Sequence, residues 1–238
     1  MTCHSPSAQT LVALEPPIRR LALLAAALVL AMLGIFVATG IGQDPLQYVH
    51  PVPEYQAILL RSPGLLRAAI GLDNLFIVAY TAMFVALRPW LLRRGAAPGM
   101  LTLALALLGL TGLLDLLENM HFLTLIAAAL ADWAPTATQI TLQVLESLVK
   151  FHVSYLGLFL LGWVWPGNTR ADRALGFALR WVQLPVGVLI YLVPPAWALP
   201  LVLCRFSFFL FALLAIAWIL RPQGQPGVGY AAGSGARG

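Results

Sequence analysis

The chain contains few charged residues. Asp, Glu, Lys and Arg make up 10% of its 238 residues, whereas a soluble domain carries about a quarter. Hydrophobic residues make up 61% of the chain, and this composition excludes a water-soluble globule. The connections between the hydrophobic stretches are short, which leaves no room for a separate soluble domain.

Basic residues and cysteines are also sparse. The 14 Lys and Arg residues are scattered among hydrophobic segments and form no consecutive block. A protein that follows a phosphate backbone needs such a block, so we expect no nucleic-acid partner. Cys3 and Cys204 lie at depths too different for a disulfide, and they indicate no redox compartment.

Six apolar stretches are each long enough to cross a hydrocarbon layer of about 30 Å. The sequence therefore predicts an all-α bundle of six transmembrane spans, at residues 21–38, 68–89, 99–131, 136–166, 174–193 and 200–221. The first stretch is longer than a signal-peptide core of about 7 to 15 residues, and this favours an uncleaved span. The third would be about 50 Å long as a helix. It must tilt, project beyond the lipid, or break near Asn119.

The remaining segments divide the chain into three parts. We expect a cytoplasmic amino-terminal segment over residues 1–17, the transmembrane domain over 18–221, and a disordered tail over 222–238, which is rich in Gly, Pro and Ala. The longest loop, residues 41–64, contains several prolines that end any helix. A short surface helix over 54–61 fits within it.

The arginines predict the orientation. If both termini are cytoplasmic, only Arg61 and Arg67 fall in outside loops, and the inside segments hold Arg19, Arg20, Arg88, Arg93, Arg94, Arg170, Arg173, Arg221 and Arg237. This asymmetry follows the positive-inside rule. The excess of Arg over Lys, with abundant Ala, Leu and Gly, is typical of a GC-rich bacterial genome. We therefore expect a bacterial plasma (inner) membrane as the location.

Several polar residues fall inside the predicted spans, where a charge is costly and is expected to face a partner or a site. Asp73, Asp115, Lys150 and Arg205 each lie about 16 residues from the Arg-rich end of their span, which is about 24 Å at a rise of 1.5 Å per residue. The candidate binding residues at or near this depth are Asp73, Asn74, Asp115, Glu118, Asn119, Glu146, Lys150 and Arg205.

Helical periodicity places these residues on shared faces. Thr111, Asp115, Glu118 and Asn119 lie on one face of their helix, and Gln139, Gln143, Glu146 and Lys150 lie on one face of the next. The pattern predicts a polar cavity that opens towards the outside. Glu146 and Lys150 could instead pair along one helix, at i,i+4 spacing.

One region has a resemblance to other proteins. Leu72-Asp73-Asn74-Leu75-Phe76, the Asp115-Leu116-Leu117-Glu118-Asn119 element and Val149-Lys150-Phe151 resemble segments of a group of uncharacterised bacterial multipass membrane proteins. The resemblance covers residues 65–165. It implies no activity, but it supports the choice of Asp73, Asp115, Glu118, Asn119 and Lys150 as site residues.

The sequence contains few signals for catalysis or cofactors. Glu118 and His121 have the Glu-x-x-His spacing of di-iron bundles, but the second copy of the motif is missing. His121 and His152 differ in expected depth by about 12 Å, too far for shared haem ligation. No serine-hydrolase, zinc-protease or nucleotide-binding motif occurs. We therefore expect neither metal nor cofactor.

Three functional hypotheses remain. The first is binding or transport of a small polar solute or ion in the polar cavity, with the lipid bilayer as the surrounding partner. The second is an intramembrane enzyme acting on a lipid or prenyl-linked substrate, with Glu118 or Glu146 as acid or base. The third is an assembly subunit in which the charges only join helices.

Overall fold

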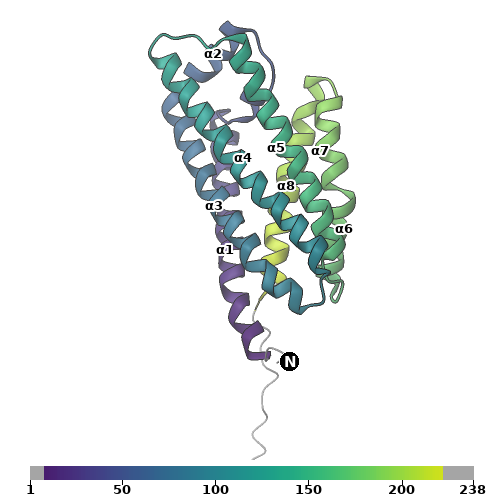
Figure 1. The fold of residues 1–238 in the computed structure, drawn as a ribbon. Coiled ribbons are helices and arrows are strands. Elements are labelled where there is room, and N and C mark those ends of the chain that lie inside the picture. Colours follow the sequence, from purple (N-terminus) through teal and green to yellow (C-terminus); the bar gives the residue numbers. More distant parts are fainter. Residues whose placement is uncertain (1–7, 222–238) are drawn as a thin grey trace, which may run out of the picture.

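The computed structural model describes the backbone of residues 8–221 and the side chains of residues 14–194 and 197–221. Within this range the chain forms α-helices, one short 3₁₀ helix and no strand, which confirms the predicted all-α architecture (Figure 1). The long helices are α1 (Ala8–Thr39), α3 (Pro63–Arg93), α4 (Pro98–Leu130), α5 (Ala137–Val164) and α8 (Pro195–Ile219). The predicted tail over 222–238, residues 1–7 and Cys3 lie outside the described part.

In the part of the chain that the structure describes, six helical segments are long and apolar enough to cross a membrane, as predicted. The fifth is not one helix, because it divides into α6 (Arg170–Trp181) and α7 (Gln183–Leu192). Pro185 explains the division, since a proline lacks the N–H that would bond to the carbonyl of Trp181 and its ring collides with that carbonyl.

Some helix ends differ from the predicted boundaries. α1 includes Pro16 and Pro17 and begins before the predicted span. α3 starts before residue 68, with Pro63 in its first turn, where the missing N–H costs nothing. α4 has 33 residues without a break at Asn119, and it runs obliquely across the bundle (Figure 1).

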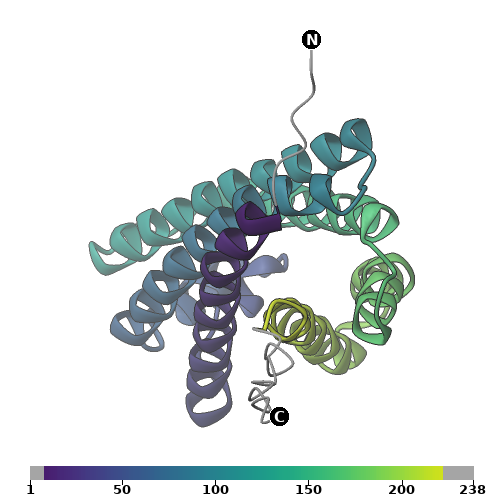
Figure 2. The same cartoon turned by 90° about the horizontal axis from the view of Figure 1, so that it is seen from below.

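The six spans form a closed ring. Seen along the bundle, α1 contacts α3, followed by α4, α5, the α6–α7 pair and α8, which returns to α1 (Figure 2). The 3₁₀ helix η1 (Asp44–Gln47) and α2 (Val52–Leu60) connect α1 to α3 at one end, which we name the α2 end. The opposite end carries most of the arginines, and we name it the arginine end.

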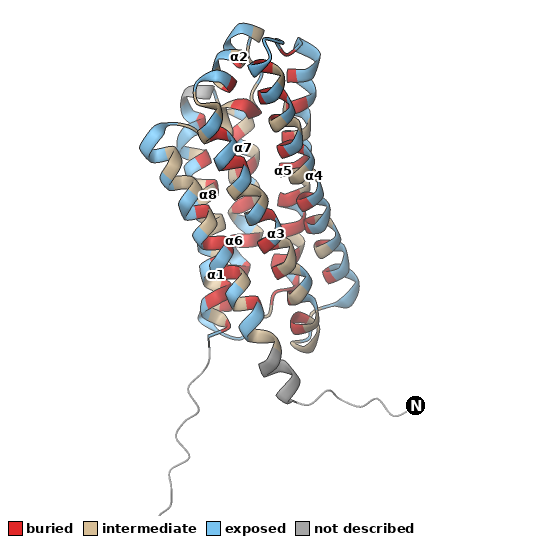
Figure 3. Cartoon of the chain, turned by 90° about the vertical axis from the view of Figure 1, so that its left-hand side faces the viewer, coloured by how far each residue is buried: buried red, intermediate tan, exposed pale blue. Residues whose placement is uncertain are grey.

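Buried residues lie on the inner faces of the helices, while the outer faces are exposed (Figure 3). They form two apolar clusters. One cluster, with Trp90, Leu101 and Leu161, fills the arginine end. The other, with Tyr55, Phe122 and Ile140, fills the α2 end. Along their helices, Asp73 of α3, Asp115 and Glu118 of α4, and Lys150 of α5 lie between the two clusters.

Candidate intramembrane site

Lys150 joins α5 to α4 through two carboxylates. Its Nζ lies 2.8 Å from Asp115 Oδ1 and also donates to Glu118 Oε2. The Lys150 side chain is 4% exposed and Glu118 is fully buried, so solvent screens neither charge. Asp115 and Glu118 reach the same ammonium group because residues at i and i+3 share a face of α4.

Neutral donors occupy the remaining oxygens of these carboxylates. The Tyr80 hydroxyl of α3 donates to Asp115 Oδ2 at 2.7 Å, and Ser147 Oγ donates to Glu118 Oε1. Each of the four carboxylate oxygens therefore has one partner, which is what a buried ion pair requires to offset its loss of hydration.

A second group lies beside this one, on α3 and α4. Asn119 Nδ2 donates to Asp73 Oδ2 at 2.8 Å and to Asn74 Oδ1 at 2.9 Å. Among the described side chains no Lys, Arg or His forms an ion pair with Asp73, whose partner is the Asn119 amide. The structure therefore brings six predicted residues together, and we name these the charged cluster: Asp73, Asn74, Asp115, Glu118, Asn119 and Lys150.

Arg205 of α8 has a partner that the sequence did not suggest. Its Nη2 donates to Asp44 Oδ1 of η1 at 3.0 Å, and its side chain is 2% exposed. Burial raises the pKa of Asp44, and the positive charge of Arg205 opposes that rise. Arg205 and Lys150 both lie over the ring of Phe151, at 4.0 and 4.3 Å from its centroid. Arg205 therefore borders the charged cluster but is neutralised by the loop.

Glu146 lies apart from the charged cluster. Its Oε2 lies 2.9 Å from His121 Nδ1, and its side chain is 39% exposed. The i,i+4 pair of Glu146 with Lys150 does not form, because the carboxylates that hold Lys150 come from α4. The buried edge of α5 instead includes Gln143, Ser147 and Lys150, so Ser147 takes the place that the predicted stripe gave to Glu146.

Two amide side chains at or near the charged cluster have atoms without a hydrogen-bond partner. Asn119 Oδ1 and both amide atoms of Gln143 are buried and form no hydrogen bond within the described residues. Glu118 bonds to Ser147 and Lys150, and His121 lies against Glu146. Within the described range, no group of three or more His, Cys, Asp or Glu is placed to hold a metal ion.

A chamber of about 140 Å³ lies inside the ring of helices, and Asp115 and Lys150 border it. Its lining is mainly apolar and aromatic, with Phe76, Tyr80, Phe84, Phe151, Phe206, Phe208 and Phe209 among its residues. Along α5 the lining extends from Lys150 to Leu161, about 16 Å towards the arginine end. This differs from the polar, outward-opening cavity predicted from the sequence. The reason is that Glu118 and Asn119 bond to neighbouring side chains instead of lining an open space.

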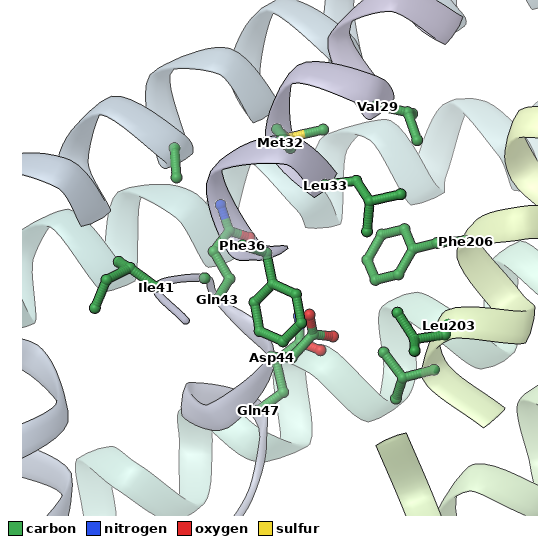
Figure 4. Close-up of a pocket in the computed structure, with 13 residues that line it drawn as sticks. Val29, Met32, Leu33, Phe36, Ile41, Gln43, Asp44, Gln47, Leu203 and Phe206 are labelled. Carbon is green, nitrogen blue, oxygen red and sulfur yellow. The ribbon is translucent and has the colours of Figure 1, made fainter. Parts of the chain in front are cut away.

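A smaller pocket of about 80 Å³ adjoins the chamber between α1 and α8. Both are lined by Val29, Met32 and Phe206. Figure 4 shows Leu33 and Phe36 of α1 on one side of this pocket and Leu203 and Phe206 of α8 on the other, with Asp44 and Gln47 of η1 beside them. We name it the α1–α8 pocket.

The six apolar helical segments and the buried charges between them define an integral membrane protein of the multi-pass helical class. Comparisons of the chain with protein-family models, with curated proteins and with solved structures give no match.

Proposed function

We propose that this protein binds a single-chain amphiphile within the membrane. The polar group of the ligand would contact Asp115 and Lys150, and its apolar chain would fill the chamber. The observation that carries this proposal is the chamber itself, because a long apolar space bordered at one level by two charged side chains matches the two chemical parts of an amphiphile.

The size of the chamber limits the ligand. A volume of about 140 Å³ is close to that of an apolar cavity that holds one benzene-sized molecule, about 150 Å³. A phospholipid with two chains would not fit. One narrow chain matches the length of the lining, and the side chains around the chamber must move apart for it to hold more carbon atoms than benzene has.

The charges favour a neutral or cationic polar group. Near the chamber, Lys150 and Arg205 are the cations, while four carboxylates lie on η1, α3 and α4: Asp44, Asp73, Asp115 and Glu118. An anionic group would be repelled by those of these carboxylates that are ionised, in a medium that screens charge poorly. A hydroxyl or an amine would donate to the carboxylates.

In this proposal the α1–α8 pocket is the route by which the ligand enters from the lipid. In a bilayer the outer faces of α1 and α8 contact acyl chains, and the pocket between them adjoins the chamber. This route supports a ligand that partitions into the membrane.

The proposal is tested by thermal stability in detergent with three probes of equal chain length: 1-decanol, decylamine and decanoate. A ligand that binds only the folded state raises the unfolding temperature. We expect the alcohol and the amine to stabilise the protein, and decanoate to have no effect.

Ala212→Phe should abolish the stabilisation by filling the chamber, whereas Leu214→Phe on the lipid-facing side of α8 should retain it. Equal effects of all three probes, or binding by the Ala212→Phe variant, would contradict the proposal.

The enzyme hypothesis shares this substrate class. However, Glu118 and Glu146, the acids on which it depends, do not line the chamber. Binding without catalysis is therefore the function that the site supports best.

A small ion or polar solute remains a second candidate. The observation that favours it is the pair of buried side chains with free hydrogen-bonding atoms, Asn119 and Gln143, beside the carboxylate of Glu118. Purified protein in vesicles under a sodium or proton gradient tests this candidate. Flux that Gln143→Leu abolishes would favour it, and no flux would exclude it.

We further propose a bacterial plasma membrane, with the arginine end in the cytoplasm, on the basis of arginine asymmetry and composition. The resemblance over residues 65–165 is likewise a proposal. The residues that carry it are in contact with one another, since Asp73 bonds to Asn119, and Asp115 and Glu118 bond to Lys150.

A further inference from the structure

Gln183 is a polar side chain that the charged cluster does not include. It lines the chamber and is 3% exposed. Neither its Nε2 nor its Oε1 has a hydrogen-bond partner within the described residues. A buried amide without a hydrogen-bond partner destabilises the fold, so a partner inside the chamber would recover that loss.

The break in the fifth span positions Gln183. The helix stops at Val182, whose φ of −112° and ψ of −51° depart from regular α geometry, and α7 begins at Gln183. Pro185 causes this break, and the new helix starts with the Gln183 side chain against the chamber. If the helix continued without a break, the periodicity of α6 would set the direction of the Gln183 side chain.

Two contacts fix the depth of Gln183 along α5. A Cβ on Gly187 would lie 2.1 Å from the Tyr155 ring, and one on Gly162 would lie 2.8 Å from Arg180. Gln183 is between Arg180 and Gly187 in sequence, so its level on α5 is between Gly162 and Tyr155, near Leu158. Leu158 also lines the chamber. Lys150 and Leu158 are eight residues apart on α5. Gln183 therefore lies about 12 Å from the charged cluster, towards the arginine end.

We propose that Gln183 binds a second polar group on the far part of the ligand. This inference rests on the proposed function and narrows the class of ligand. The ligand is a chain with one hydroxyl or amine at Asp115 and Lys150, and a second neutral hydrogen-bonding group, a hydroxyl or carbonyl, about 12 Å away along the chain. An amide both donates and accepts, so Gln183 serves either group.

The experiment compares terminal diols with 1-alkanols of equal chain length, bound to the full chain in detergent and counted by native mass spectrometry. We expect one diol length to bind more tightly than the matching alkanol by about 3- to 10-fold, as one neutral hydrogen bond provides. In Gln183→Leu the ratio of diol to alkanol affinity should fall to about one. This variant removes an unpartnered buried amide, so it should fold at least as well as the wild type. Gln56→Leu on α2, outside the chamber lining, is the matched control and should retain the wild-type ratio.

The outcomes separate the two proposals. If alkanols bind but no diol binds better, or if Gln183→Leu retains the preference, the role of Gln183 is wrong while the proposed function stands. If neither alkanols nor diols bind, the proposed function fails first, and the second polar group fails with it.

Discussion

Lys150 and Asp115 connect neighbouring helices, with the ammonium of α5 2.8 Å from a carboxylate oxygen of α4. The same ammonium contacts Glu118 of α4. One cation thus compensates two buried acids, which distinguishes this arrangement from a simple pair and determines how it should respond to mutation.

Removing Lys150 leaves both acids without a cation, so we expect Lys150→Met to destabilise the fold by several kcal/mol. Adding Asp115→Asn should restore part of the loss, because Glu118 is still uncompensated. Adding Glu118→Gln as well should restore most of it. Thermal unfolding in detergent, analysed as a mutant cycle, measures the coupling.

Glu146→Gln is the matched control in this cycle. Its carboxylate bonds to His121 and not to Lys150, so its effect should add to that of Lys150→Met without coupling. Coupling of Lys150 to Glu146, or strict additivity with Asp115, would contradict the arrangement.

Periodicity predicted much of this site, because the residues that meet on α4 and α5 are separated by three or four positions. Periodicity could not decide whether Glu146 or Ser147 lies at the buried edge of α5. Both fall near the same edge of α5, and the choice depends on the angle at which α4 crosses it. Charge made Glu146 the stronger candidate, yet Ser147 lies at the buried edge and bonds to Glu118.

Asp44 could not be predicted for a different reason. It belongs to a loop, whose path has no period that a sequence reveals, and it meets Arg205 from 161 positions away. By contrast, the break at Val182 had a local signal in Pro185, whose effect on the preceding turn follows from its ring. Gln183 carries no charge, so nothing in the sequence marked it as a site residue. Its position in the chamber is known only from the structure.

Gly187 provides a test of the packing between α5 and α7. An added Cβ would lie 2.1 Å from the Tyr155 ring, and the fully buried Tyr155 has little space to move. We expect Gly187→Ala to destabilise by about 1 to 3 kcal/mol, and Tyr155→Leu to relieve part of this loss.

Gly71→Ala is the control for that variant. A Cβ there has no atom within 4 Å, and alanine is favoured over glycine inside a helix by about 0.5 to 1 kcal/mol. The control should therefore be neutral or stabilising. Equal unfolding temperatures for the two variants would mean that the close contact with Tyr155 is absent.

The pair of Arg205 and Asp44 should hold the loop against α8. We expect Arg205→Gln to increase amide hydrogen exchange over residues 41–50 by at least tenfold, because it leaves Asp44 without a charged partner. Arg67→Gln, an exposed change on α3, should leave that exchange unchanged. Unaltered protection in the Arg205→Gln variant would show that other contacts, such as the bond from Tyr55 to the Leu46 carbonyl, are enough to fix the loop.

The orientation of the bundle predicts the outcome of reporter fusions. Arg94 follows the last residue of α3 and Arg173 lies in the first turn of α6, both at the arginine end, whereas His50 lies between η1 and α2 at the opposite end. Placing the arginine end outside would require the translocation of most of the short arginine-bearing connections, which the positive-inside rule opposes. A cytoplasmic reporter fused after Arg94 or Arg173 should therefore be active, and one inserted near His50 should be inactive.

Replacing Arg93, Arg94, Arg170 and Arg173 by Gln should reduce this difference, while the same change at Arg61 and Arg67 should preserve it. An active cytoplasmic reporter near His50 in the unmodified chain would contradict the proposed orientation.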